Sequence, residues 1–183
     1  MHTKDFQKNK LKGDFAELIC KHHFELMGCD VQKVGIEELS PAFAKLRSAK
    51  KAVASLKKQM QLMPDFLVVH PDGNNASFVE VKYRNNSNKG FLREFSKELH
   101  LRYSEFIKDS TPVYFYLVTN QAPFIHIMKA NILGCHKETG GFYPAQDSSL
   151  DGLPFFRGYK DNSSFNAIYN SIICPTIKEL IVK

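Results

Sequence analysis

The chain has 183 residues, of which 43% are hydrophobic and 24% are charged. This length supports one substantial hydrophobic core, so we expect a single domain over residues 1–183. No segment approaches the roughly 18 consecutive apolar residues of a membrane-spanning helix, and we expect no secretory signal, which excludes a membrane partner. The four cysteines lack zinc-binding or disulfide-type spacing, which is typical of reduced thiols in a cytoplasmic protein.

The positive charge of the chain is unevenly distributed. The formal net charge is +6, and residues 1–134 carry 20 basic and 14 acidic side chains, whereas residues 135–183 carry five of each. Clustered positive charge favours a nucleic-acid partner more than a small overall excess does.

Two elements are predicted at the beginning of the chain. Apolar residues at helical spacing predict a helix over residues 13–27, which Gly28 would end. A short strand is expected over residues 30–35. The first helix carries Glu17 close to the edge of its apolar stripe.

A long amphipathic helix is predicted over residues 40–63, because apolar residues recur there at steps of three and four. Ser40 is a suitable N-cap and Pro41 a suitable first helical residue. The polar side of this helix contains no acid, and its basic residues are Lys45, Arg47, Lys50, Lys51, Lys57 and Lys58. This basic stripe could contact phosphates or serve only as a solvated face, and the apolar side could instead form a coiled coil that makes a homodimer.

The middle of the chain predicts a hairpin followed by a helix and two strands. Strands are expected over residues 66–70 and 77–84, around a turn that contains Gly73. A helix over 91–108 and buried strands over 112–119 and 124–128 follow. After residue 134 the sequence indicates a loop-rich C-terminal extension, in which only residues 164–173 and 177–182 have helical character.

The second strand of the hairpin carries the residues that suggest chemistry. Alternation along a strand places Glu80 and Lys82 on one face and Val81 on the other. If the hairpin folds about Gly73 and Asn74, Asp65 lies opposite Lys82 and diagonal to Glu80. The two carboxylates and the Val81 carbonyl are hard oxygen ligands that suit Mg²⁺, or Mn²⁺. The alternative is an ordinary cross-strand ion pair between Asp65 and Lys82, with Glu80 facing solvent.

These residues resemble the motif of the PD-(D/E)xK nuclease superfamily. The matching positions are Pro64 and Asp65, then Glu80, Val81 and Lys82, with Lys12, Gly13 and Glu17 similar to the first motif of the family. The stretches KGDFAELICKHHFELMGCDV, MPDFLVV and FVEVKYR are most similar to Holliday junction resolvases and related small endonucleases. The resemblance covers residues 12–128.

The resemblance implies a restriction-endonuclease-like α/β core with a mixed four- to five-stranded sheet flanked by helices in the order αβββαβ. It implies that Asp65 and Glu80 bind Mg²⁺, that Lys82 is the catalytic lysine, and that Glu17 assists. The helical insertion over 40–63 and the extension over 134–183 depart from the family pattern.

The expected function is therefore that of a Mg²⁺-dependent endonuclease acting on DNA. Arg84 and Lys89, in the loop after the second hairpin strand, are further phosphate-binding candidates. The alternative is a nucleic-acid-binding module of the same fold that does not cleave, or a subunit of a larger nucleic-acid-processing complex.

Overall fold

The computed structural model describes residues 2–34, 63–103, 112–130, 141–146 and 164–181. The helices of these ranges, one of them a π-helical turn, are α1 (His2–Leu26), α5 (Lys89–Tyr103), α6 (Phe165–Ile168), η5 (Tyr169–Ile173) and α7 (Cys174–Ile181). The strands are β1 (Asp30–Lys33), β2 (Phe66–Val69), β3 (Ala76–Arg84), β4 (Val113–Thr119), β5 (Ile125–Lys129) and β6 (Tyr143–Pro144). Within the described ranges, no helix is long and apolar enough to cross a membrane.

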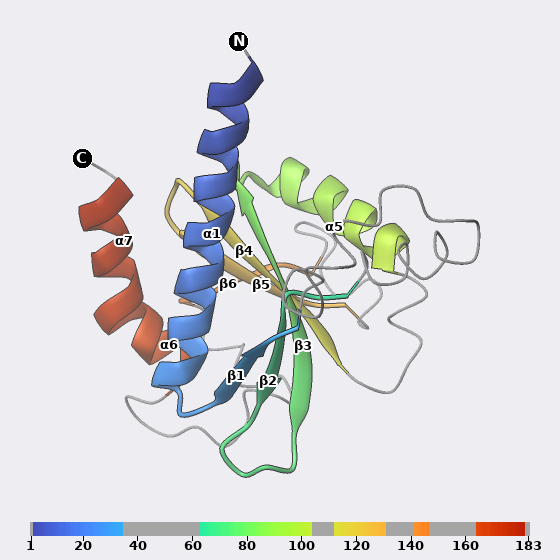
Figure 1. Cartoon of the computed structure of the whole chain (residues 1–183), viewed down its shortest axis with the longest axis vertical. Coiled ribbons are helices and arrows are strands. Elements are labelled where there is room, and N and C mark those ends of the chain that lie inside the picture. Colours follow the sequence, from blue (N-terminus) through green and yellow to red (C-terminus); the bar gives the residue numbers. More distant parts are fainter. Residues whose placement is uncertain (1, 35–62, 104–111, 131–140, 147–163, 182–183) are drawn as a thin grey trace.

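The strands form one mixed six-stranded sheet in which they follow their order in the sequence (Figure 1). Neighbouring strands are antiparallel except for β3 and β4, which are parallel. A parallel connection needs a crossover, and α5 lies in the sequence between these two strands. The predicted four- to five-stranded sheet was too small, because β6 contains only two residues and has no periodicity that a sequence could reveal.

Two hydrophobic clusters cover the two faces of the sheet. On one face, buried residues of α1, α6, η5 and α7 pack against the sheet, and on the other face α5 does so (Figure 1). The alternation of β3 follows this division, since Val79 and Val81 belong to the α1 side and Phe78 packs on the α5 side. Glu80 and Lys82 therefore lie on the α5 side, as the alternation predicts.

Most of the predicted elements occur, with different ends. α1 begins well before residue 13, in a polar stretch where apolar periodicity gives no signal, and it ends at Leu26, before Gly28 with its positive φ of 82°. The expected helical segments at the C-terminal end form one continuous helical run, from α6 through the π-helical turn η5 to α7. Residues 40–62 of the predicted helix over 40–63 and the last residues of the predicted helix over 91–108 lie outside the described residues, and the described Met63 is not helical.

Candidate functional site

The candidate site lies where β2 and β3 separate. The two strands pair from Phe66 with Val79 to Val69 with Ala76, so the C-terminal half of β3 pairs only with β4 among the described strands. Asp65, just before β2, replaces the missing strand partner, because its Oδ2 accepts a hydrogen bond of 2.7 Å from the Val81 amide. This side-chain bond satisfies a backbone donor at an otherwise open strand edge.

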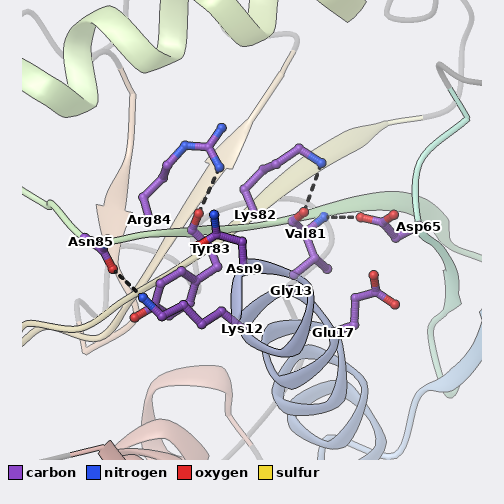
Figure 2. Close-up of a pocket in the computed structure, with 10 residues that line it drawn as sticks. All are labelled: Asn9, Lys12, Gly13, Glu17, Asp65, Val81, Lys82, Tyr83, Arg84 and Asn85. Atoms are coloured by element: carbon purple, nitrogen blue, oxygen red, sulfur yellow. Dashed lines mark hydrogen bonds between the residues drawn. The ribbon is translucent and has the colours of Figure 1, made fainter. Parts of the chain in front are cut away.

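A cavity of about 470 Å³ opens at this edge, between β3 and one face of α1 (Figure 2). Its lining contains four of the residues predicted for the site, together with Arg84. The full lining is Asn9, Lys12, Gly13, Glu17, Asp65, Val81, Lys82, Tyr83, Arg84 and Asn85. Among the α1 residues, Asn9, Gly13 and Glu17 follow each other at steps of four and Lys12 is three positions after Asn9, which places them on a single helix face.

The hairpin register differs from the predicted one by two residues. Phe66 pairs with Val79, and continuing this register would bring Asp65 opposite Glu80, where the sequence analysis expected Lys82. The turn is centred one residue earlier than predicted. Asp72 fixes it, since its carboxylate accepts a hydrogen bond of 2.8 Å from the Asn74 amide, and Gly73 adopts a φ of 69°.

The environment of Asp65 disfavours the ionised form of its carboxyl group. Burial raises the pKa of Asp65 to about 6, and the nearby Glu80 carboxylate adds to this rise. Lys82 and the hydrogen bond from the Val81 amide act in the opposite direction and only partly compensate. A positive charge placed beside Asp65 would therefore stabilise its ionised form.

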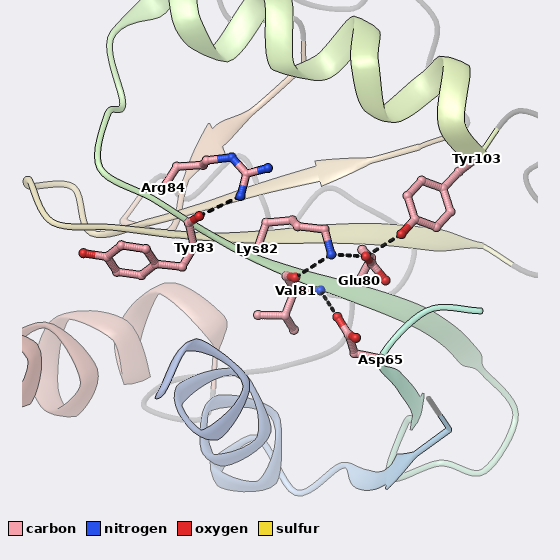
Figure 3. Close-up of polar contacts among 7 residues, drawn as sticks. All are labelled: Asp65, Glu80, Val81, Lys82, Tyr83, Arg84 and Tyr103. Carbon is pink, nitrogen blue, oxygen red and sulfur yellow. Dashed lines mark hydrogen bonds and ion pairs between the residues drawn. The ribbon is translucent and has the colours of Figure 1, made fainter. Parts of the chain in front are cut away.

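Glu80 is buried in the protein and has two partners on the α5 side (Figure 3). Its Oε1 accepts hydrogen bonds from Lys82 Nζ and from the hydroxyl of Tyr103, the last residue of α5. The alternative interpretation of the sequence, with Glu80 in solvent and Lys82 paired with Asp65, is therefore wrong. Lys82 Nζ also donates to the Val81 carbonyl at 3.1 Å, which orients the lysine along the strand.

Tyr103 is a partner of the site that the sequence analysis did not identify. The pKa of its hydroxyl is raised by burial and by the adjacent Glu80 carboxylate, so the phenol remains a donor. In the sequence Tyr103 continues the apolar stripe of α5, four residues after Leu99, and this stripe gave no sign of a polar role. A buried tyrosine hydroxyl needs a hydrogen-bond partner, but the sequence does not indicate which group that partner is.

Glu17 projects from α1 toward Asp65 and lines the same cavity (Figure 2). Its carboxylate forms an ion pair of 3.0 Å with Lys33 of β1, and its side chain is 27% exposed. Glu17 and Asp65 thus form one acidic wall, whereas Glu80 is not part of the lining.

No group of three His, Cys, Asp or Glu side chains in the described part of the chain is arranged to hold a metal ion. The oxygen donors of the lining residues include the carboxylates of Asp65 and Glu17 and the carbonyl of Val81. These are hard donors of the kind that Mg²⁺ accepts, so the donor chemistry fits a magnesium ion. Glu80 is not among the lining residues, and its Oε1 accepts hydrogen bonds from Lys82 and Tyr103.

Two of the predicted phosphate-binding residues belong to the described part of the chain. Arg84 lines the cavity, and Lys89 is the exposed first residue of α5 and is not part of the lining. The six basic residues of the stripe over 40–63 lie outside the described residues. Lys12, Asn85 and Tyr83 line the cavity as well, and their shared position was not evident from the sequence because it depends on how α1 crosses β3.

Comparison of the chain with protein-family models, with curated proteins and with solved structures gives no match.

Proposed function

We propose that this chain is a metal-dependent endonuclease with a restriction-endonuclease-like core, which hydrolyses phosphodiester bonds in DNA. The observation that supports this most strongly is the arrangement around Val81. Its amide binds Asp65, its carbonyl receives Lys82, and Glu80 lies directly before it in the strand. Two carboxylates, a carbonyl and a lysine thus lie around one short segment of β3, beside a cavity whose lining also includes Lys12 and Arg84.

In this proposal Asp65, Glu80 and the Val81 carbonyl hold Mg²⁺ or Mn²⁺, and Glu17 assists from α1. Such an ion, when bound, polarises a phosphodiester and lowers the pKa of a bound water. The raised pKa of Asp65 supports the assignment, because a buried carboxylate beside a second one is stabilised by an added cation.

Lys82 is the proposed group that positions the attacking water. Its Nζ is held between the Glu80 carboxylate and the Val81 carbonyl, and its side chain is 21% exposed, so it can still reach the cavity. An ammonium group at this place also offsets the repulsion between the carboxylates and the substrate phosphate.

The described residues on either side of the basic stripe support a role of this stripe in binding nucleic acid. The chain leaves the described part after Val34 and returns at Met63, and the Val34 amide donates a 3.0 Å hydrogen bond to the Asp65 carbonyl. Both ends are therefore held beside the candidate site. This arrangement supports the proposal that the stripe from Lys45 to Lys58 contacts phosphates of the same substrate.

The test is cleavage of labelled duplex, branched and single-stranded DNA, and of RNA, by the purified chain with Mg²⁺, Mn²⁺ or EDTA. We expect cleavage of DNA that requires the metal and is lost in Asp65→Asn and in Glu80→Ala, while both variants remain folded. Lys97→Gln is a matched control, since Lys97 pairs with Glu94 on the exposed side of α5. Cleavage that persists in EDTA, or that survives both carboxylate substitutions, would contradict the proposal.

The second candidate is a nucleic-acid-binding module that does not cleave. The observation in its favour is that Glu80 is engaged by Lys82 and Tyr103 and is not part of the cavity lining. This candidate predicts DNA binding by the wild-type chain with no cleavage under any metal condition.

A further inference from the structure

The cavity at the edge of β3 has two ends of opposite charge. Glu17 and Asp65 form the acidic end, and the other end carries Lys12 from α1 and Arg84 from β3 (Figure 2). Within the described ranges, neither Lys12 nor Arg84 forms an ion pair with a carboxylate. Two uncompensated cations at one end of a cavity raise the local concentration of anions.

Lys12 is held in place by neutral groups. Its Nζ donates a hydrogen bond of 3.2 Å to the side-chain oxygen of Asn85, and it lies 5.1 Å from the centroid of the Tyr83 ring. This distance is within the range of a cation–π interaction. Both contacts fix the position of the ammonium group without cancelling its charge.

Arg84 is held in the same manner on the other side of the strand. Its Nη1 donates a hydrogen bond of 2.8 Å to the Tyr83 carbonyl, and its guanidinium carbon lies 4.6 Å from the centroid of the Phe95 ring. The remaining guanidinium donors have no described carboxylate to bind, and their planar geometry suits phosphate oxygens.

We infer that Lys12 and Arg84 form a second phosphate subsite, which binds the phosphate next to the one at Asp65 and Lys82. This inference rests on the proposed function and specifies its substrate class, a polynucleotide chain and not a single phosphoester. The cavity volume of about 470 Å³ lies within the usual range of ligand pockets. Because the two cations are already positioned, binding requires little further ordering of their side chains.

The experiment measures binding of fluorescein-labelled duplex DNA by fluorescence anisotropy over a range of KCl concentrations. All proteins carry Asp65→Asn, so the probe stays intact. We expect Lys12→Gln to weaken binding roughly tenfold, the effect of losing one charge-assisted hydrogen bond. We also expect the slope of log affinity against log salt to decrease in magnitude by about 0.9, as for one lost phosphate contact.

Two control variants distinguish an effect of the position of the Lys12 charge from an effect of the overall charge of the protein. Lys12→Arg keeps the cation and should retain most of the affinity. Lys10→Gln makes the same charge change two residues away on α1, where the exposed Lys10 does not line the cavity, and it should leave affinity and salt slope unchanged. Arg84→Gln tests the other wall independently and should also weaken binding, which covers the case of an unfolded Lys12 variant.

The outcomes separate this inference from the proposed function. Unchanged affinity in both Lys12→Gln and Arg84→Gln would overturn the subsite, even if the wild-type chain cleaves DNA with Mg²⁺. An equal loss in Lys10→Gln would also overturn it, since the effect would then be one of overall charge. Binding that depends on Lys12 without any metal-dependent cleavage would retain the subsite and overturn the nuclease proposal, and no binding at all would overturn both.

Discussion

The hydroxyl of Tyr103 donates a hydrogen bond to the buried carboxylate of Glu80, and this bond joins the last residue of α5 to the middle of β3. Both groups are almost fully removed from solvent, with 1% and 3% of their surfaces exposed. A buried carboxylate needs hydrogen-bond donors, and here Tyr103 and Lys82 supply them from two different elements.

Replacing Tyr103 with Phe should lower the free energy of unfolding by about 1–3 kcal/mol, because the buried carboxylate of Glu80 loses one of its donors. Urea denaturation at neutral pH measures this change. A double-mutant cycle with Glu80→Ala provides the control, since the Tyr103→Phe effect should become much smaller once the carboxylate is absent. Equal effects in both backgrounds would show that the hydroxyl does not act through Glu80.

Asp65→Asn should raise the thermal stability of the metal-free chain at pH 7 to 8. The raised pKa of Asp65, about 6, means that the folded state binds a proton more tightly than the unfolded state does. The wild-type chain is therefore penalised above about pH 6, and the penalty disappears as the pH falls toward 4. Each kcal/mol gained corresponds to roughly 2–4 °C in Tm for a chain of this size, measured by calorimetry.

Asp72→Asn is the contrasting control for this pH dependence. The hydrogen bond from the Asn74 amide lowers the pKa of Asp72, so its contribution is present at neutral pH and is lost as the pH falls through its own pKa. The stability gain expected for Asp65→Asn should be absent in Asp72→Asn. A gain of the same size in both variants would mean that only the reduced negative charge matters.

Gly13 offers a way to fill the cavity without destabilising the helix. A Cβ atom at this position would have no heavy atom within 4 Å outside its own helix turn, and Gly13 is part of the cavity lining. Gly13→Ala should stabilise the chain by about 0.5–1 kcal/mol, because glycine is a poor residue inside a helix. Gly13→Leu should also remain stable but weaken DNA binding, with Gly13→Ala as its matched control.

His23→Phe should destabilise the chain by about 1–3 kcal/mol at pH 7. The imidazole of His23 is buried, bonds the Tyr116 hydroxyl and the Phe165 carbonyl at 2.9 Å each, and stacks on the Phe165 ring. Phe would keep much of the stacking but leave the two oxygens without this partner. Denaturation of the adjacent His22→Phe variant is the control, since His22 is exposed.

The loss of stability caused by His23→Phe should become smaller at low pH. Burial lowers the pKa of His23 to about 3, so the folded state keeps it neutral while the unfolded state binds a proton below about pH 6.5. The contribution of His23 to the stability of the wild-type chain is fully present above that pH and is lost progressively as the pH falls toward 3. A destabilisation by His23→Phe that stays constant from pH 7 to pH 4 would contradict this assignment.

The sequence was sufficient to predict the faces of β3, because alternation is a local property of a strand. It was not sufficient for the hairpin register, since the position of the turn depends on the side-chain bond of Asp72 to the Asn74 amide. The contact between Tyr103 and Glu80 could not be predicted from the sequence either. It depends on how α5 lies across the sheet, and a tyrosine in an apolar stripe looks the same whether or not its hydroxyl meets a carboxylate.

The contacts of α1 fall into an early and a late group along the chain. The two hydrogen-bond partners of the His23 ring lie 93 and 142 residues later in the sequence, in β4 and α6. The strands lie side by side in the order in which they follow in the sequence, and the buried face of α1 packs both on these strands and on α6 and η5. The described partners of the site residues on α1 all belong to the early group, because Glu17 pairs with Lys33 and Lys12 contacts Asn85 and Tyr83. A chain that ends before α6 would therefore still contain every one of these partners.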